Sequence, residues 1–95
     1  MANPISALQS LYRHECQVCG ATFEVGGKRF IQTHHIDPSK GDVWGNLLVI
    51  CPNHHFEVET ALANHVPVVI DLRKREALVG DKVYPLRVVP EHLEN

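Results

Sequence analysis

Apolar residues near the start of the chain recur at helical spacing. They are Ile5, Leu8, Leu11 and Tyr12, separated by three, three and one positions. This spacing places the four side chains on one face of a short helix. Asn3 can cap the first turn, and Pro4 suits the first helical position. The pattern therefore predicts a packing helix that ends near residues 13–14.

The middle of the chain alternates short apolar runs with turn-forming residues. We expect, in order, an extended segment at 22–25, a glycine turn at 26–27, a second extended segment at 29–36, a polar loop at 37–45, a fully apolar strand at 47–50 and a helix from 53 to about 63. This order predicts a hairpin followed by a helix.

From residue 66 onward the pattern changes to short β-rich runs separated by polar turns. We expect two or three strands between residues 66 and 90, folded as a β-hairpin that covers the core. The segment offers scattered charges and no evident catalytic group. With the helices before it, it predicts an α+β fold, and 95 residues suit a single domain.

A chain of this size builds only a marginal hydrophobic core, so a structural metal is a common addition. Three cysteines cannot all pair with one another, which favours metal binding over disulfides and a reducing compartment. No apolar run approaches the roughly 20 residues that a membrane span needs, and the first residues lack a signal-peptide pattern. We expect a cytoplasmic protein.

Two residue pairs have the spacing of a zinc site. Cys16 and Cys19 form one pair, and Cys51 and His54 form the other, each separated by two residues. A structural zinc takes four tetrahedral ligands, usually cysteine or histidine, in two such pairs. The sequence therefore predicts one structural Zn²⁺ that uses all three cysteines.

Four further polar residues concentrate around the predicted hairpin and helix: His34, His35, Asn46 and His55. Adjacent residues on a strand point to opposite sides, so His34 and His35 are not expected to share one metal. The natural division is one metal ligand and one base.

The combined pattern resembles the HNH endonuclease family. It consists of C-x-x-C, HHI-x-P, Asn-Leu and C-x-x-H-H, spread over residues 11–62. The start, LY-x-x-x-CQVCG, is similar to the zinc-stapled nuclease domains of bacterial restriction proteins. The resemblance implies a ββα-metal, treble-clef-like core; residues 66–90 lie outside it.

The resemblance also implies roles for the remaining residues. His34 and His55 would bind a catalytic divalent cation, His35 would be the general base that activates water, and Asn46 would hold the loop that aims His35. The implied activity is metal-dependent hydrolysis of phosphodiester bonds in DNA, with double-stranded DNA as the first expectation. RNA or single-strand cleavage uses the same machinery, and a non-catalytic, zinc-stabilised nucleic-acid-binding module is the alternative function.

Two positions depart from the family pattern. His54 stands where many relatives have cysteine, which zinc chemistry allows. Glu59 stands where some relatives have a further histidine, and it shares a helix face with His55. Glu59 is a third ligand, an outer partner or a solvated carboxylate. A carboxylate favours Mg²⁺ or Mn²⁺, although another transition metal is also compatible.

Charge argues against strong DNA binding by this chain alone. The formal net charge is −2, and the segment between Arg13 and Cys51 carries four basic and four acidic residues. Candidate phosphate contacts are Lys28, Arg29 and Lys40. The ordinary interpretation of such residues is that they are solvated charges in loops. We therefore expect a fused or associated recognition domain, a partner or a second copy, unless the basic residues of 66–90 supply DNA-facing strands.

Overall fold

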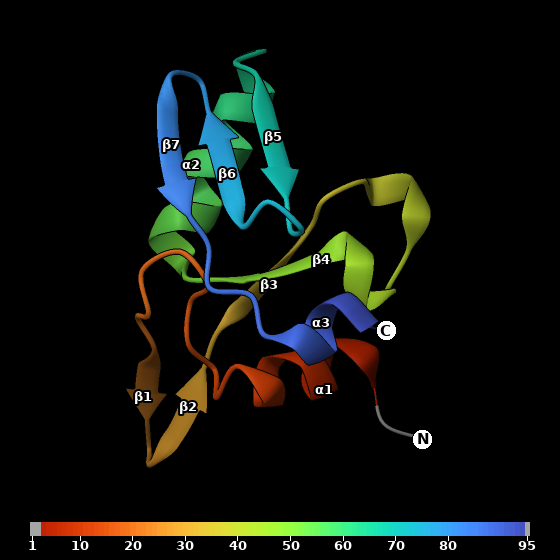
Figure 1. Ribbon diagram of the computed structural model, residues 1–95. Helices are drawn as coiled ribbons and strands as arrows, with labels where there is room; N and C mark the ends of the chain where they lie inside the picture. The colour runs from red at the N-terminus through yellow and green to blue at the C-terminus, as the bar shows by residue number, and fades with distance from the viewer. Residues whose placement is uncertain (1–2, 95) are drawn as a thin grey trace.

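The computed structural model describes residues 3–94, which form three small antiparallel sheets and short helices (Figure 1). The elements are, in order, α1 (Pro4–Leu11), β1 (Phe23–Val25), β2 (Lys28–Phe30), β3 (Gln32–His35), the 3₁₀ turns η1 (Pro38–Lys40) and η2 (Trp44–Asn46), β4 (Leu47–Ile50), α2 (Pro52–Ala63), β5 (Val68–Asp71), β6 (Glu76–Val79), β7 (Lys82–Pro85) and α3 (Pro90–Glu94). This is the α+β architecture that the sequence predicted.

Strand β4 is the centre of the molecule and is buried on both faces. Leu48 and Ile50 join a core that includes α2 and the C-terminal sheet. Leu47 and Val49, which alternate with them, pack instead with the apolar face of α1. Because one short apolar strand serves two cores, it fixes the positions of the elements on either side.

The free edge of β4 is closed by Gln17 rather than by another strand. The Gln17 backbone N–H donates to Val49 O over 2.9 Å, and the Val49 N–H donates to Gln17 Oε1 over 2.8 Å. The Gln17 side-chain amide also donates to Arg87 O over 2.9 Å. Gln17 is only 1% exposed, so its polar groups satisfy backbone groups that water cannot reach.

Helix α1 confirms the predicted N-terminal helix but ends earlier, at Leu11. The Asn3 side chain accepts from the backbone N–H of Ile5 over 2.9 Å, as a cap should. Arg13 and His14 then adopt positive φ angles of 56° and 57°. This left-handed backbone cannot continue a helix, which explains the earlier end.

The extended segment predicted at 29–36 divides into two strands that belong to different sheets. Strand β2 pairs with β1 across the Gly26–Gly27 turn, whose φ angles of 60° and 78° suit a tight hairpin. Strand β3 pairs with β4. Between them, the partly buried Ile31 packs against both cores. The hairpin β1–β2 projects away from the rest of the molecule in Figure 1.

The C-terminal segment has more structure than the predicted β-hairpin. It forms a three-stranded sheet in the order β5–β6–β7, with Val68 opposite Val79 and Ala77 opposite Tyr84. The sheet covers α2 in Figure 1. The short helix α3 follows it and was not predicted, because five residues, most of them polar, carry no helical repeat. Within residues 3–94, no helix is long and apolar enough to cross a membrane.

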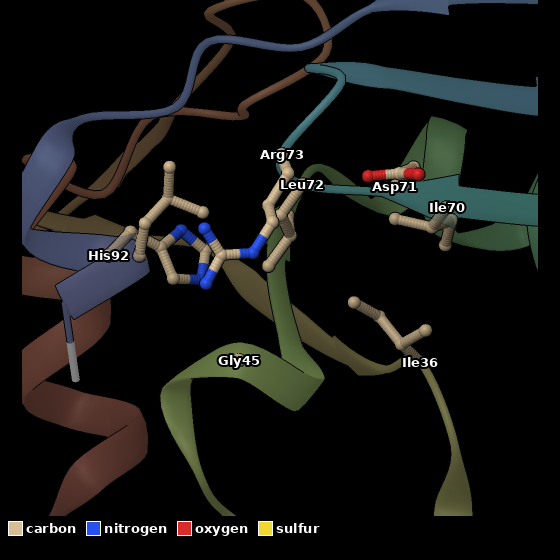
Figure 2. Close-up of a pocket in the computed structure, with 8 residues that line it drawn as sticks. Ile36, Gly45, Ile70, Asp71, Leu72, Arg73 and His92 are labelled. Atoms are coloured by element: carbon tan, nitrogen blue, oxygen red, sulfur yellow. The ribbon is translucent and has the colours of Figure 1, made fainter.

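A shallow hollow of about 220 Å³ lies where α3 meets the ends of β3 and β5. Figure 2 shows Arg73 and His92 among the residues that line it, together with the apolar side chains of Ile36 and Ile70. None of the metal-capable groups described below lies in this hollow. Among the described residues, the chemistry is therefore concentrated elsewhere.

Candidate active site

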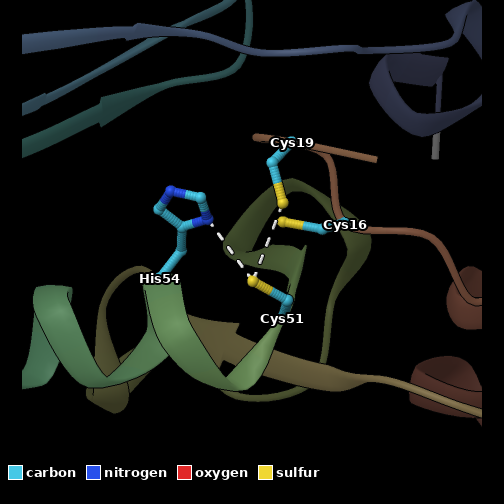
Figure 3. A group of neighbouring side chains, drawn as sticks. All are labelled: Cys16, Cys19, Cys51 and His54. Atoms are coloured by element: carbon cyan, nitrogen blue, oxygen red, sulfur yellow. Dashed lines mark hydrogen bonds between the residues drawn. The ribbon is translucent and has the colours of Figure 1, made fainter. Parts of the chain in front are cut away.

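Four side chains from two distant segments converge as the sequence predicted (Figure 3). Cys16 and Cys19 lie in the turn after α1, and Cys51 and His54 lie at the start of α2. Their donor atoms all lie within 4.8 Å of one another. Cys51 Sγ is 3.3 Å from His54 Nδ1 and 3.8 Å from Cys19 Sγ. The set can surround a single ion.

The turn that carries the first two cysteines is held by its own backbone. The Cys16 N–H donates to Ala21 O over 2.8 Å, and the Gly20 N–H donates to Cys16 O over 2.8 Å. Gly20 has a φ of 79°, a conformation that disfavours side chains. The Val18 N–H points at Cys16 Sγ over 3.3 Å. An N–H that donates to sulfur favours the thiolate, which is the metal-binding form.

The chemistry of this set fits a bound cation. Partial desolvation, with the neighbouring thiols of Cys16 and Cys51 acting in the same direction, raises the pKa of Cys19 to about 11. Sulfurs packed this closely cannot carry several negative charges unless a positive ion balances them. Three sulfurs and one imidazole nitrogen are the donors of a structural zinc site.

A second set of metal-capable groups lies on a different side of α2. It consists of His34 on β3 with His55 and Glu59 on α2, and their donor atoms again lie within 4.8 Å of one another. Glu59 Oε1 is 3.2 Å from His34 Nδ1 and 3.2 Å from His55 Nε2. The sequence left the role of Glu59 open, and the structure places its carboxylate beside both histidines.

Two features prepare these histidines to act as ligands. Burial lowers the pKa of His34, against the opposing effect of the Glu59 carboxylate, and so favours the neutral imidazole that metals bind. His55 Nδ1 lies 2.9 Å from Gln32 Oε1. An amide oxygen can only accept, so Nδ1 carries the hydrogen and Nε2 is left to face Glu59.

His35 points to the other side of β3, as alternation on a strand requires. Its Nε2 lies 2.6 Å from Asp42 Oδ1. His35 therefore follows a member of the metal-capable set in sequence, but its own partner is Asp42 and not Glu59. Asp42 was not singled out from the sequence, because it lies in a loop without periodicity.

Asn46 fixes the loop between β3 and β4. Its Nδ2 donates to Asp37 O over 2.8 Å and to Gly41 O over 2.9 Å. Its Oδ1 accepts from the Asp37 N–H over 2.7 Å. Asn46 is 4% exposed, so these three bonds replace water for both ends of the loop.

One cleft of about 640 Å³ is lined both by the set of His34, His55 and Glu59 and by the pair of His35 and Asp42. It is lined by Thr33, His34, His35, Ile36, Pro38, Gly41, Asp42, His55, Glu59 and Leu62. Of the candidate phosphate contacts, Lys40 lies between two lining residues, but Lys28 and Arg29 lie on the hairpin β1–β2 and do not line the cleft. Arg29 is instead 3.5 Å from the Glu15 carboxylate.

The family model described as HNH endonuclease matches residues 16–58, which hold both metal-capable sets but for Glu59. The chain carries a domain of the HNH endonuclease family. A solved structure described as "Modification dependent TagI restriction endonuclease" resembles this chain with a TM-score of 0.73 and 30% sequence identity. No curated protein sequence matches the chain significantly.

The similarity extends beyond the matched motif. The structural match covers 90% of this chain, and therefore includes much of the C-terminal sheet as well as the HNH core. It covers only 31% of the length of the TagI chain. The chain therefore corresponds to about a third of the TagI chain, and the family match supports a nuclease-type function.

Proposed function

We propose that residues 1–95 act as one nuclease module that hydrolyses phosphodiester bonds in double-stranded DNA. The motif core would be residues 11–62 and the β-rich extension residues 66–90. One observation carries the proposal: a single cleft is lined both by a metal-capable trio and by an imidazole that is not part of it. Hydrolysis of a phosphodiester needs both a cation and a base.

The residues divide between these two tasks. His34, His55 and Glu59 would hold one divalent cation, and their mixed imidazole and carboxylate donors are compatible with Mg²⁺, Mn²⁺ or another transition metal. When bound, such an ion stabilises negative charge on the phosphate and on the leaving oxygen. Cys16, Cys19, Cys51 and His54 would hold the structural Zn²⁺, which takes no part in the chemistry.

His35 would be the general base. An imidazole accepts a proton near neutral pH, which is what activation of a water molecule requires. Asn46 would act on His35 indirectly, since it holds the loop that packs against the base. Both side chains are therefore assigned to the reaction, but only His35 meets the reacting water.

The module would work with a recognition element. Support comes from the balanced charge of the motif segment and from the partial coverage of the restriction enzyme that the chain resembles. A fused or associated domain would bring DNA to the cleft and supply the choice of sequence. Lys40, beside the cleft, would contact phosphate, and the outlying Lys28 and Arg29 would contact it farther along the duplex.

The test is cleavage of a supercoiled plasmid in the presence of Mg²⁺, Mn²⁺, Co²⁺ or Ni²⁺ by the wild type and by His35→Ala. Loss of a general base is expected to slow cleavage by about 10²–10⁴-fold, with zinc content and circular dichroism unchanged. His65→Asn is a matched control, because His65 is an exposed histidine outside the cleft.

Two results would contradict the proposal. Cleavage by His35→Ala at the wild-type rate would place the base elsewhere, with His34 the next candidate. If the wild type binds DNA but cleaves none with any of the four metals, the chain is the non-catalytic binding module.

A further inference from the structure

Asp42 faces the proposed general base at a distance that implies a specific hydrogen bond. Its Oδ1 lies 2.6 Å from His35 Nε2. A carboxylate has no hydrogen to donate when ionised, so the shared hydrogen belongs to Nε2. Within residues 3–94, Nδ1 of His35 has no hydrogen-bond partner. In the neutral imidazole, this contact places the hydrogen on Nε2 and leaves the lone pair on Nδ1.

The position of Asp42 is set by the fold. Asp42 directly follows Gly41, whose carbonyl accepts from Asn46 Nδ2 over 2.9 Å. The same amide group holds Asp37 at the other end of the loop. Asn46 is buried in the turn that leads into β4. A chain of contacts thus runs from the core through Asn46 and Gly41 to Asp42, and from Asp42 to His35.

We propose that Asp42 is a positioning residue, which holds His35 as the Nε2–H tautomer with Nδ1 directed to the water that attacks DNA. This inference rests on the proposed nuclease function. Nδ1 takes a proton from the water, whose oxygen bonds to phosphorus as the P–O3′ bond breaks, and the 3′ oxygen takes a proton from solvent. Nε2–H stays bonded to Asp42 throughout, so the carboxylate faces the imidazolium as it forms.

The proposal also gives Asn46 a specific task. Its hydrogen bonds hold the backbone immediately before Asp42, so its influence on His35 passes through that carboxylate. If this is so, loss of Asp42 and loss of Asn46 damage the same contact. Their effects on the rate at saturating DNA then fail to add, as expected of residues in one network.

The first test compares Asp42→Ala with Asp42→Asn in plasmid cleavage. Asp42→Ala removes the acceptor and is expected to lower kcat by about 10–100-fold, less than the roughly 10²–10⁴-fold expected for loss of the base, because His35 itself remains. KM should not rise, because a negative charge has been removed from a cleft that binds phosphate. The amide oxygen of Asp42→Asn still accepts from Nε2–H, so this variant should recover most of the lost rate.

Asp81→Asn serves as the matched control, since Asp81 is an exposed loop aspartate that does not line the cleft. It makes the same charge change and should cleave as the wild type does. A purely structural role for Asp42 would raise KM and lower stability as well as kcat. Faster cleavage by Asp42→Ala would show that Asp42 covers the base, and it would overturn the proposal.

The second test does not depend on cleavage. Nitrogen-15 NMR of the histidine rings in the full chain reports the tautomer of each imidazole directly. His35 should be a single Nε2–H tautomer in the wild type and in Asp42→Asn, and a mixture in Asp42→Ala. An unchanged tautomer in Asp42→Ala would refute the positioning role. If no variant cleaves DNA, the nuclease function fails while this spectrum still decides the role of Asp42.

Discussion

At the scale of single residues, His92 shows how the fold uses a polar group that water cannot reach. It has no exposed surface. Its Nε2 lies 2.8 Å from Trp44 O and 3.0 Å from Leu47 O, and its Nδ1 lies 2.7 Å from the Tyr12 hydroxyl. Carbonyls only accept, so Nε2–H donates, and in the neutral ring Nδ1 accepts from the Tyr12 hydroxyl. Complete burial among uncharged partners therefore requires the neutral imidazole.

This requirement predicts a loss of stability in mild acid. Burial lowers the pKa of His92, although the carbonyls of Trp44 and Leu47 act in the opposite direction. Below the unfolded pKa of about 6.5, the unfolded chain binds a proton that the folded chain resists. The free energy of unfolding therefore falls as pH decreases from about 6.5, by at most about 1.4 kcal/mol per pH unit for this one group.

The measurement is urea unfolding of the wild type and His92→Gln between pH 8 and pH 5. His92→Gln should be less stable at pH 8 but should lose less on acidification. His65→Asn, an exposed histidine variant, should keep the wild-type slope. Parallel pH profiles for the wild type and His92→Gln would show that His92 does not contribute to this dependence.

Single residues also show which parts of the site the sequence predicts. The two x-x pairs are local, because a turn or the start of a helix brings Cys16 to Cys19 and Cys51 to His54. Gln32 meets His55, and Asp42 meets His35, only after strand register and loop closure are fixed. Their residue types carry no signal at those positions. Contacts that depend on tertiary structure are therefore missing from the prediction.

At the scale of elements, helix α2 contributes to both metal-capable sets. Cys51, its N-cap, and His54 belong to one set, and His55 and Glu59 belong to the other. His54 and His55 are neighbours, about 100° apart around the helix axis, so they face different partners. His54 also packs its ring edge-to-face with Tyr84 of β7, at 5.4 Å between ring centroids. The set of Cys16, Cys19, Cys51 and His54 is thus linked to the C-terminal sheet.

The adjacent histidines allow a matched prediction. His54→Ala should lose the structural zinc and much of the folded population, because structural metal binding contributes directly to folding. His55→Ala should keep the zinc and the fold but lose cleavage. Metal analysis and circular dichroism, each compared with the wild type, check both expectations. A fully folded His54→Ala protein without zinc would show that the fold does not need the ion.

The order of elements was predictable because each has a local signal, such as the apolar spacing of α1 or the continuous apolar run of β4. The division of residues 29–36 between two sheets was not. It depends on the tight turn at Gly26–Gly27 and on Ile31, which packs against both cores. Two or three C-terminal strands were expected, but the sheet that all three form together depends on strand pairing, which a hydrophobic pattern does not specify.

At the scale of the whole molecule, three of the nine Lys and Arg residues form ion pairs within the described residues 3–94. Arg29 and Arg87 both contact the Glu15 carboxylate, at 3.5 Å and 3.1 Å. Lys82 lies 3.1 Å from Glu57. The net charge of −2 gives the chain no overall electrostatic attraction to a duplex. The described residues also offer no exposed helix that is free for a major groove, because α1, α2 and α3 each pack on the core or the site.

We therefore expect the isolated chain to bind DNA weakly, to cleave with little sequence preference and to lose activity as salt rises. The measurement is binding to random and defined duplexes between about 50 and 200 mM salt, the range over which phosphate contacts weaken strongly. Lys40→Ala should weaken binding to both duplexes equally, and Lys74→Ala, in the turn after β5, is the control. Tight, selective binding at physiological salt would contradict the need for a recognition element.

The hydrogen bonds between Gln17 and β4 have a consequence for aggregation of the protein. Gln17 lies between the first two cysteines, so the proposed zinc also keeps the outer edge of an entirely apolar strand covered. Removing the ion would free this edge before the chain had fully unfolded, and an uncovered apolar edge recruits strands from other molecules. Removal of the metal should therefore cause self-association before unfolding. After a chelator is added, light scattering should increase before the helical circular-dichroism signal is lost, and the increase should be larger at higher protein concentration.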